Sequence, residues 1–203
     1  VPKVDLLTNG MVLTKAKREA IHATKSISTL QFSMDGGTPK EFETIRTRAK
    51  WDVFYPQIIQ LLRENKALAQ PKTVGIIALM PNEAQLKEKK FHPQYQEILD
   101  LADHVEFRLA HNWAGQIDGD QGSNIPKKPW KLGCNMMMDQ LVIFPNGGVS
   151  ICCNDLNAKA VVGNFLEEGL YSAYSSEQRR SWLADMARNR TDRIELCRDC
   201  ERF

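Results

Sequence analysis

The spacing of four cysteines constrains the fold of this chain more than any other feature of its sequence. Cys134 and Cys152 are single cysteines, whereas Cys197 and Cys200 form a Cys-x-x-Cys pair. A Cys-x-x-Cys turn can direct two thiolates at one metal ion or cluster. The two single cysteines can supply further ligands only if the chain folds back on itself.

The segment between Cys134 and Cys152 predicts such a fold. Residues 139–151 contain two short apolar runs joined by Asn146-Gly147, and an Asn-Gly pair between apolar runs is the strongest short-range signal of a β-hairpin. A hairpin brings its two ends together. We therefore expect Cys134 and Cys152 to meet, with the Cys-x-x-Cys pair completing a four-thiolate site.

The spacing alone leaves the nature of this site open. A zinc ribbon usually has two Cys-x-x-Cys pairs and this chain has one, which favours an iron–sulfur cluster over structural zinc. Four unrelated buried thiols are a third interpretation, because unpaired cysteines are commonly buried and inert. Cys153 is predicted to be a packed thiol outside the site, since neighbouring residues of a strand point to opposite faces.

The composition argues against several classes of partner. The 203 residues include 27 Lys and Arg and 25 Asp and Glu, for a net charge of +2, so we expect no nucleic-acid partner and a solvated helix face for the arginines between Arg179 and Arg193. No apolar run approaches the roughly 18 residues of a membrane span, so we expect no membrane partner. Five cysteines with metal-like spacing favour a reducing compartment and predict a cytoplasmic protein.

Residues 1–115 alternate short apolar runs with amphipathic stretches. Strands are predicted at 4–7, 27–33, 74–80 and 105–109, and helices at 14–24, 52–66 and 95–102. Such repetition is typical of an α/β fold with a parallel sheet. Ligands of these sheets bind at the carboxyl ends of the strands, where the sequence places Thr8, Ser33, Asp35, Met80 and Asn82.

A change of composition predicts a second domain. Residues 110–133 are rich in Gly, Pro, Asn and Lys, which is typical of a connection between domains, and the linker is placed at 116–133. Residues 134–203 follow, with the cysteines, the predicted hairpin and two predicted helices at 166–175 and 177–189. We therefore expect domains at 1–115 and 134–203.

Taken together, these motifs resemble those of radical S-adenosylmethionine (SAM) enzymes that carry a C-terminal iron–sulfur domain of the SPASM or shorter twitch type. The matching pieces are Leu-Thr-Asn-Gly at 7–10, Ser-Met-Asp-Gly at 33–36 with Arg46 downstream, and Cys-x12-Gly-x4-Cys at 134–152 with Cys-x2-Cys at 197–200. Their order and distances carry the resemblance. It extends over the whole chain, which resembles the C-terminal two thirds of such an enzyme.

The resemblance implies a fold and a SAM site. The α/β fold would be a partial parallel (βα) barrel, its four strands resembling strands 3 to 6 of a six-unit barrel, followed by a small hairpin-plus-helix cysteine domain. Thr8, Ser33 and Asp35 would lie near the nucleoside and amino-acid parts of SAM. Arg46 would face the SAM carboxylate, which suits a fixed guanidinium fork, and Met80 would pack near the adenine.

The resemblance also implies an activity. The family's Cys-x3-Cys-x2-Cys signature for the catalytic 4Fe-4S cluster is absent from these residues, which implies a fragment that is inactive alone. The intact enzyme, an oxidoreductase or maturase, would use SAM and that cluster to generate a 5'-deoxyadenosyl radical that abstracts hydrogen from substrate. No residue of this chain is assigned as catalytic.

The auxiliary site would hold one 4Fe-4S cluster with Cys134, Cys152, Cys197 and Cys200 as ligands. Four protein thiolates leave no open iron, so electron transfer is favoured over substrate ligation. The implied partners are a small-molecule or peptide substrate and a reduced electron-donor protein. The alternative is a non-catalytic structural module, in which zinc or an iron–sulfur site only stabilises the C-terminal domain.

Overall fold

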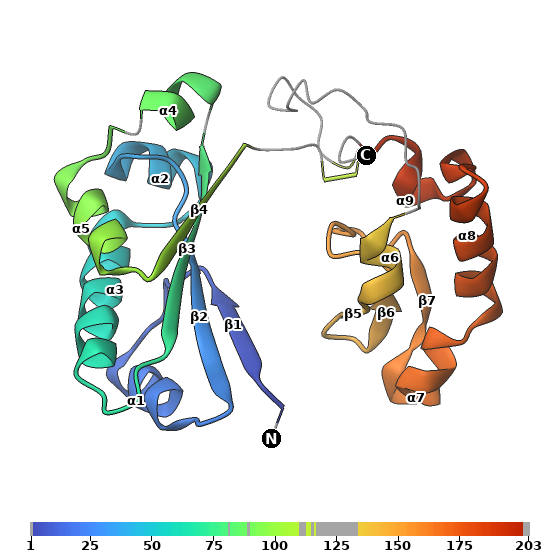
Figure 1. The fold of residues 1–203 in the computed structure, drawn as a ribbon, viewed down its shortest axis with the longest axis horizontal. Helices are drawn as coiled ribbons and strands as arrows, with labels where there is room; N and C mark the ends of the chain where they lie inside the picture. The colour runs from blue at the N-terminus through green and yellow to red at the C-terminus, as the bar shows by residue number, and fades with distance from the viewer. Residues whose placement is uncertain are drawn as a thin grey trace. The chain divides into compact units, whose positions relative to one another are not determined.

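The structure, a computed structural model, describes residues 2–80, 82–88, 90–109, 113–114, 116 and 134–200 (Figure 1). It divides into two units, Val1–Leu109 and Ala110–Phe203, and each is described by itself. Of the predicted linker at 116–133, all but residue 116 lies outside the described residues.

The N-terminal unit contains a four-stranded parallel sheet in the order β1-β2-β3-β4. The strands are β1 (Val4–Thr8), β2 (Ile27–Ser33), β3 (Thr73–Met80) and β4 (His104–Leu109). All four predicted strands are present, and the predicted α/β fold with a parallel sheet is confirmed. The parallel pairing brings the carboxyl ends of the strands to one edge, where Ser33 pairs with Ile77 and Met80 with Leu109.

Five helices are described in this unit, and Figure 1 shows α3 and α5 on one side of the sheet. They are α1 (Lys15–Ala23), α2 (Pro39–Ile45), α3 (Trp51–Lys66), α4 (Glu83–Glu88) and α5 (Pro93–Leu101). The three predicted helices correspond to α1, α3 and α5. Helix α2 was not predicted, although its start is well marked. Thr38 caps it by accepting a hydrogen bond from the Glu41 amide, and the Glu41 carboxylate accepts one from the amide of Gly37, the residue before the cap.

The core of this unit lies between the sheet and the helices. Alternate residues of β2 and β3, including Phe32 and Ile76, pack into one apolar cluster with α3 and α5. Trp51 of α3 stacks on Tyr95 of α5 with ring centroids 5.5 Å apart. The Tyr95 hydroxyl donates to the Met34 carbonyl, which ties α5 to the chain just beyond β2.

The C-terminal unit contains a small antiparallel sheet in the order β5-β6-β7. Its elements are α6 (Asn135–Asp139), β5 (Val142–Ile143), β6 (Gly148–Ser150), β7 (Val161–Asn164), α7 (Phe165–Tyr174), α8 (Glu177–Ala187), the 3-10 helix η1 (Thr191–Arg193) and α9 (Glu195–Arg198). The predicted hairpin is β5-β6. Its turn needs a glycine, because Gly147 has a φ of +87° and a Cβ there would lie 2.5 Å from Asn164 Oδ1.

One prediction about charge is wrong in this unit. Arg179 does not lie on a solvated face: it is 4% exposed, and its Nη2 donates to the carbonyls of Met137 and Met138 at 3.0 and 3.4 Å. Its guanidinium also lies 4.0 Å from the ring centroid of Tyr174. Arg180, the next residue, is exposed as predicted.

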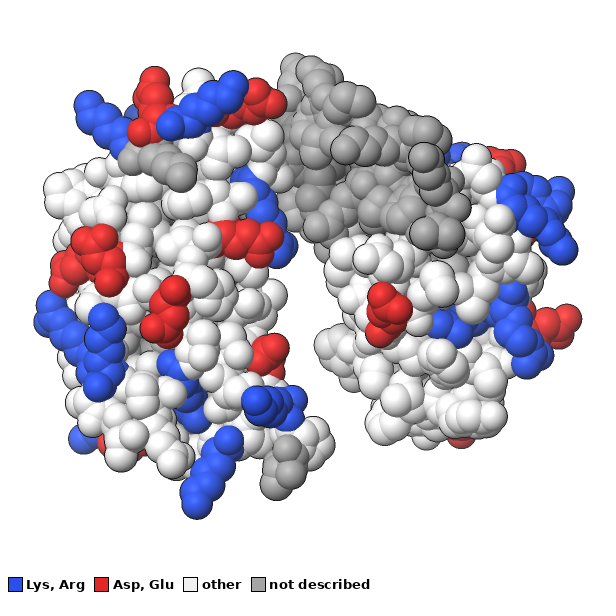
Figure 2. Space-filling model, in the orientation of Figure 1, with Lys and Arg blue, Asp and Glu red and all other residues white. Residues whose placement is uncertain are grey.

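On the face of the N-terminal unit seen in Figure 2, basic and acidic side chains are interspersed, and neither kind forms a separate patch. Among the described helices, none combines the length and apolar character that crossing a membrane requires.

Candidate metal centre and cofactor rim

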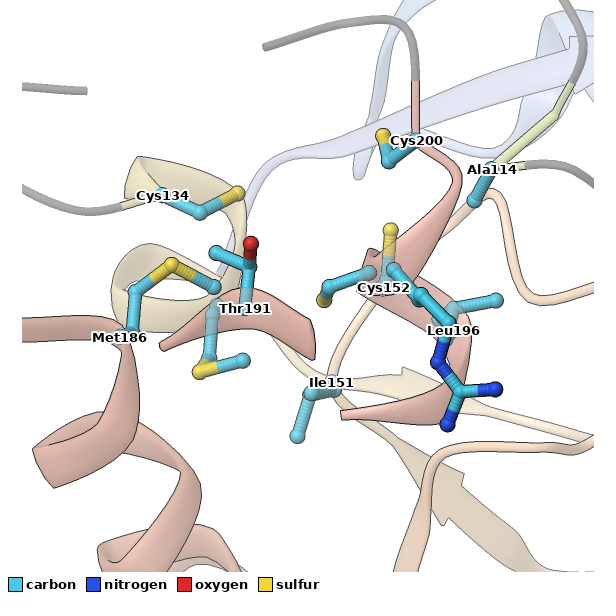
Figure 3. Close-up of a pocket in the computed structure, with 11 residues that line it drawn as sticks. Ala114, Cys134, Ile151, Cys152, Met186, Thr191, Leu196 and Cys200 are labelled. Carbon is cyan, nitrogen blue, oxygen red and sulfur yellow. The ribbon is translucent and has the colours of Figure 1, made fainter. Parts of the chain in front are cut away.

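The predicted metal ligands come from three parts of the C-terminal unit. Cys134 caps the start of α6, Cys152 follows β6, Cys197 lies in α9 and Cys200 follows that helix. All four line one cavity of about 100 Å³ (Figure 3). Its other lining residues are Ala114, Met137, Ile151, Met186, Thr191, Leu196 and Arg198.

The cavity has room for a group of several atoms. A single water needs roughly 10–15 Å³ measured in the same way, and this cavity is several times larger. Its walls are mostly apolar, apart from the thiols, the Thr191 hydroxyl and the Arg198 guanidinium. In the described part of the chain, no three His, Cys, Asp or Glu side chains lie close enough together to hold a single metal ion.

Two thiols of this cavity, those of Cys152 and Cys197, have a raised pKa and favour their protonated form. Burial raises the pKa of Cys197 to about 12, helped by the neighbouring Cys134 and Cys200. The pKa of Cys152 is raised further, first by its hydrogen bond with Cys153 and then by burial. Iron or zinc would reverse this preference, because a coordinated thiol is deprotonated by the positive charge of the metal.

Cys152 and Cys153 differ in exposure, but not for the predicted reason. Cys152 lines the cavity, whereas Cys153 is exposed, so the prediction of a packed thiol at Cys153 is wrong. Strand β6 ends at Ser150, and therefore strand alternation does not act at these positions. A turn begins at Cys152 instead, with a hydrogen bond from the Asp155 amide to the Cys152 carbonyl, and the two thiols stay within hydrogen-bond reach of each other.

Sequence reasoning missed the polar residues of the cavity wall. Arg198 lies between the two cysteines of the Cys-x-x-Cys pair, so its position in the sequence could have indicated that it lies close to the site. Thr191 precedes the pair by several residues, in η1, and no sequence pattern indicates that its side chain reaches the cavity.

The predicted SAM-binding residues lie at the carboxyl ends of the first three strands. Thr8 ends β1, Ser33 ends β2 and Met80 ends β3. Thr8 and Ser33 are half-buried and Met80 is buried. The Thr8 hydroxyl accepts a hydrogen bond from the Gly10 amide at 3.2 Å, so it stabilises the turn that follows β1.

Asp35 and Arg46, the remaining two, lie in direct contact. Arg46 Nε is 2.8 Å from Asp35 Oδ2, although the N–H is not aligned as a hydrogen bond to it. Asp35 is 3% exposed, and its Oδ1 accepts a hydrogen bond from the Leu79 amide at 2.8 Å. The carboxylate therefore holds the guanidinium at the rim of the sheet and links β3 to the chain after β2.

Comparison with protein families identifies the cysteine unit. Residues 134–201 match the model of the SPASM iron–sulfur cluster-binding domain. Residues 134–201 are therefore similar to a SPASM domain. The match covers all four cysteines of the cavity, and the SPASM domain begins at the first of them.

Comparison with solved structures concerns the fold of the whole chain. The crystal structure of BtrN in complex with AdoMet and 2-DOIA matches with a TM-score of 0.54 and 16% sequence identity. The match covers 98% of this chain and 59% of BtrN, so the chain spans less than two thirds of the protein that it matches. No curated protein matches the chain. This likeness concerns the fold alone, and it agrees with the fold that the resemblance to radical SAM enzymes implies.

Proposed function

We propose that this chain is part of a radical SAM enzyme, in which Cys134, Cys152, Cys197 and Cys200 hold one auxiliary 4Fe-4S cluster. One observation carries the proposal: four cysteines from separate segments line a single cavity inside the SPASM domain. Cys197 and Cys200 alone could form an ordinary turn. Cys134 and Cys152 line the same cavity only because the hairpin between them folds the chain back on itself. The site therefore depends on the fold of the domain.

The size of the cavity supports a cluster more than a single ion. Each thiolate of a 4Fe-4S cluster binds a different iron atom, so the four sulfurs must stand apart around a space. A tetrahedral zinc instead draws four sulfurs to about 2.3 Å from one point. The cavity of about 100 Å³ between these cysteines suits the first arrangement.

The sheet rim of the N-terminal unit is the proposed SAM site. The residues proposed to contact SAM are Thr8, Ser33, Asp35, Arg46 and Met80. We propose that the sheet belongs to a partial (βα) barrel. Ligands of parallel sheets bind at this edge, and BtrN, which matches in fold, was solved with AdoMet bound. Asp35 already orients Arg46, so the guanidinium could meet a carboxylate with little loss of side-chain entropy.

The chemistry would come from the cofactors and the positioning from the chain. When bound, SAM and its cluster supply the 5'-deoxyadenosyl radical that abstracts hydrogen from a small-molecule or peptide substrate. The apolar wall of the SPASM cavity, including Ile151 and Leu196, would limit water around the auxiliary centre. Four thiolate ligands favour electron transfer there, and the proposed protein partner is a reduced electron donor.

The test is anaerobic reconstitution followed by iron, sulfide and zinc analysis of the purified chain. We expect about four irons and four sulfides, the composition of one 4Fe-4S cluster. Cys152→Ala should lose the cluster, and Cys153→Ala, the neighbouring control, should retain it. One equivalent of zinc without iron would favour the non-catalytic structural module, and equal loss in both variants would refute the ligand assignment.

A further inference from the structure

A buried carboxylate organises the loop that carries Cys152. Asp155 is 3% exposed and lies in the connection between β6 and β7. Its Oδ2 accepts hydrogen bonds from the Ser150 hydroxyl at 2.7 Å and the Ala160 amide at 2.9 Å, and its Oδ1 accepts one from the Lys159 amide at 2.8 Å. Ser150 ends one strand and Ala160 directly precedes the next, so one side chain joins both ends of the loop.

The same loop aims a backbone donor at the Cys152 sulfur. The Asn154 amide donates to Cys152 Sγ at 3.4 Å, and the Asp155 amide donates to the Cys152 carbonyl at 3.2 Å. A second side chain also bonds this loop: Gln116 Nε2 donates to the Asn154 carbonyl at 2.5 Å, and Gln116 Oε1 accepts from the Asn157 amide at 3.1 Å. The turn is thus held by two side chains, with its N–H group directed at the predicted ligand.

We infer that Asp155 is a positioning residue for the auxiliary centre: its three hydrogen bonds hold the loop in which Cys152 faces the cavity and the Asn154 amide donates to the Cys152 sulfur. The inference rests on the proposed function, in which Cys152 is a ligand. Groups that orient a metal ligand strongly affect how tightly the metal is held. Hydrogen bonds to the sulfurs also set the reduction potential of an iron–sulfur cluster.

The substitution Asp155→Asn tests this with little change of volume. An amide has one oxygen and one NH2 group, so in either orientation its NH2 would face the Lys159 amide or the Ala160 amide, donor against donor. We expect the reconstituted cluster to be lost to an iron chelator roughly tenfold faster than in the unsubstituted chain. Asp139→Asn makes the same chemical change at an exposed residue that ends α6, outside this loop, and we expect an unchanged rate.

A second variant and a second measurement distinguish a role of Asp155 in positioning Cys152 from a general destabilisation of the domain. Ser150→Ala removes one of the three donors and keeps the charge and both amides, so we expect a smaller increase in the rate and a normally folded domain. In resonance Raman spectra, the iron–sulfur stretching bands should shift on deuteration of the Asn154 amide. This shift should be reduced in Asp155→Asn, and it should persist in Asp139→Asn.

The inference is overturned if Asp155→Asn keeps both the release rate and the isotope shift of the unsubstituted chain, or if Asp139→Asn loses its cluster equally fast. Its failure is distinct from failure of the proposed function. If the reconstituted chain binds zinc and no iron, the proposed function fails, and zinc release from Asp155→Asn against the unsubstituted chain still decides whether Asp155 positions Cys152.

Discussion

The hydrophobic cores of the two units differ in the kinds of side chain that they contain. The N-terminal unit packs a parallel sheet against helices through large apolar side chains such as Phe32, Phe54 and Trp51. The C-terminal unit has strands of two to four residues, and its apolar cluster includes Cys134, with Cys152, Cys197 and Cys200 packed against it. Hydrophobic burial can stabilise the first unit alone. A domain as small as the second usually needs a staple such as a metal centre.

Removal of the metal centre should give the largest difference between the units. Metal binding at a structural site contributes on the order of 10 kcal/mol to folding, so we expect the cluster-free chain to lose hydrogen-exchange protection across β6 and α8. Protection of β2 and β3 should be unchanged. The measurement is hydrogen exchange by mass spectrometry on the full chain with and without the cluster, and equal protection of β6 and α8 in both states would break the comparison.

Replacement of Arg179 should give an intermediate effect, confined to the C-terminal unit. Arg179→Met keeps much of the side-chain volume but leaves the Met137 carbonyl without its charged donor. Hydrogen bonds to charged groups contribute about 1.5–3 kcal/mol, so we expect a loss of about this size in the free energy of unfolding.

Denaturant unfolding followed by cluster absorbance measures this loss, and Arg180→Met is the matched control because Arg180 is exposed. The control should change the free energy of unfolding by less than about 0.5 kcal/mol. An equal effect in the two variants would show that burial of the guanidinium does not matter.

Lowering the pH should give the smallest of these effects, a slight loss of stability in the N-terminal unit. A hydrogen bond from Arg18 lowers the pKa of Glu64 below its ordinary value, with Arg18 Nε 2.9 Å from Glu64 Oε2. A lowered pKa stabilises the fold above the ordinary value of about 4.5, and this stabilisation is lost as the pH falls through the lowered pKa. The ion pair is partly exposed, so the effect should be small.

Unfolding by denaturant at pH 6 and at pH 3, followed by tryptophan fluorescence, measures this effect. Glu64→Gln should lose less stability over that interval than the unsubstituted chain. Equal losses in both would mean that the Arg18 pair does not contribute to the acid sensitivity of this unit.

Features that depend on residues close together in the sequence were predicted correctly, whereas features that depend on contacts between distant segments were missed. Strands β1 to β4 and the turn at Asn146-Gly147 depend on local apolar patterns and on a glycine with positive φ, so they were predicted close to their observed bounds. Strand β7 was missed: its four residues are short, and they become a strand only by pairing with β6. The packed thiol assigned to Cys153 failed because β6 ends at Ser150, which no local pattern indicates.

The sequence by itself determined which residue types were available for the site: four thiols at spacings that a hairpin and a closing pair can bring together. It also determined the alternation of strands and helices, since apolar periodicity is a property of neighbouring residues. Only the tertiary structure decided that Asp155 joins both ends of the ligand loop, that Arg179 is buried and that Asp35 pairs with Arg46. Each of these depends on contacts between polar groups that meet only when separate segments pack, and a buried charge is tolerated only where such contacts are complete.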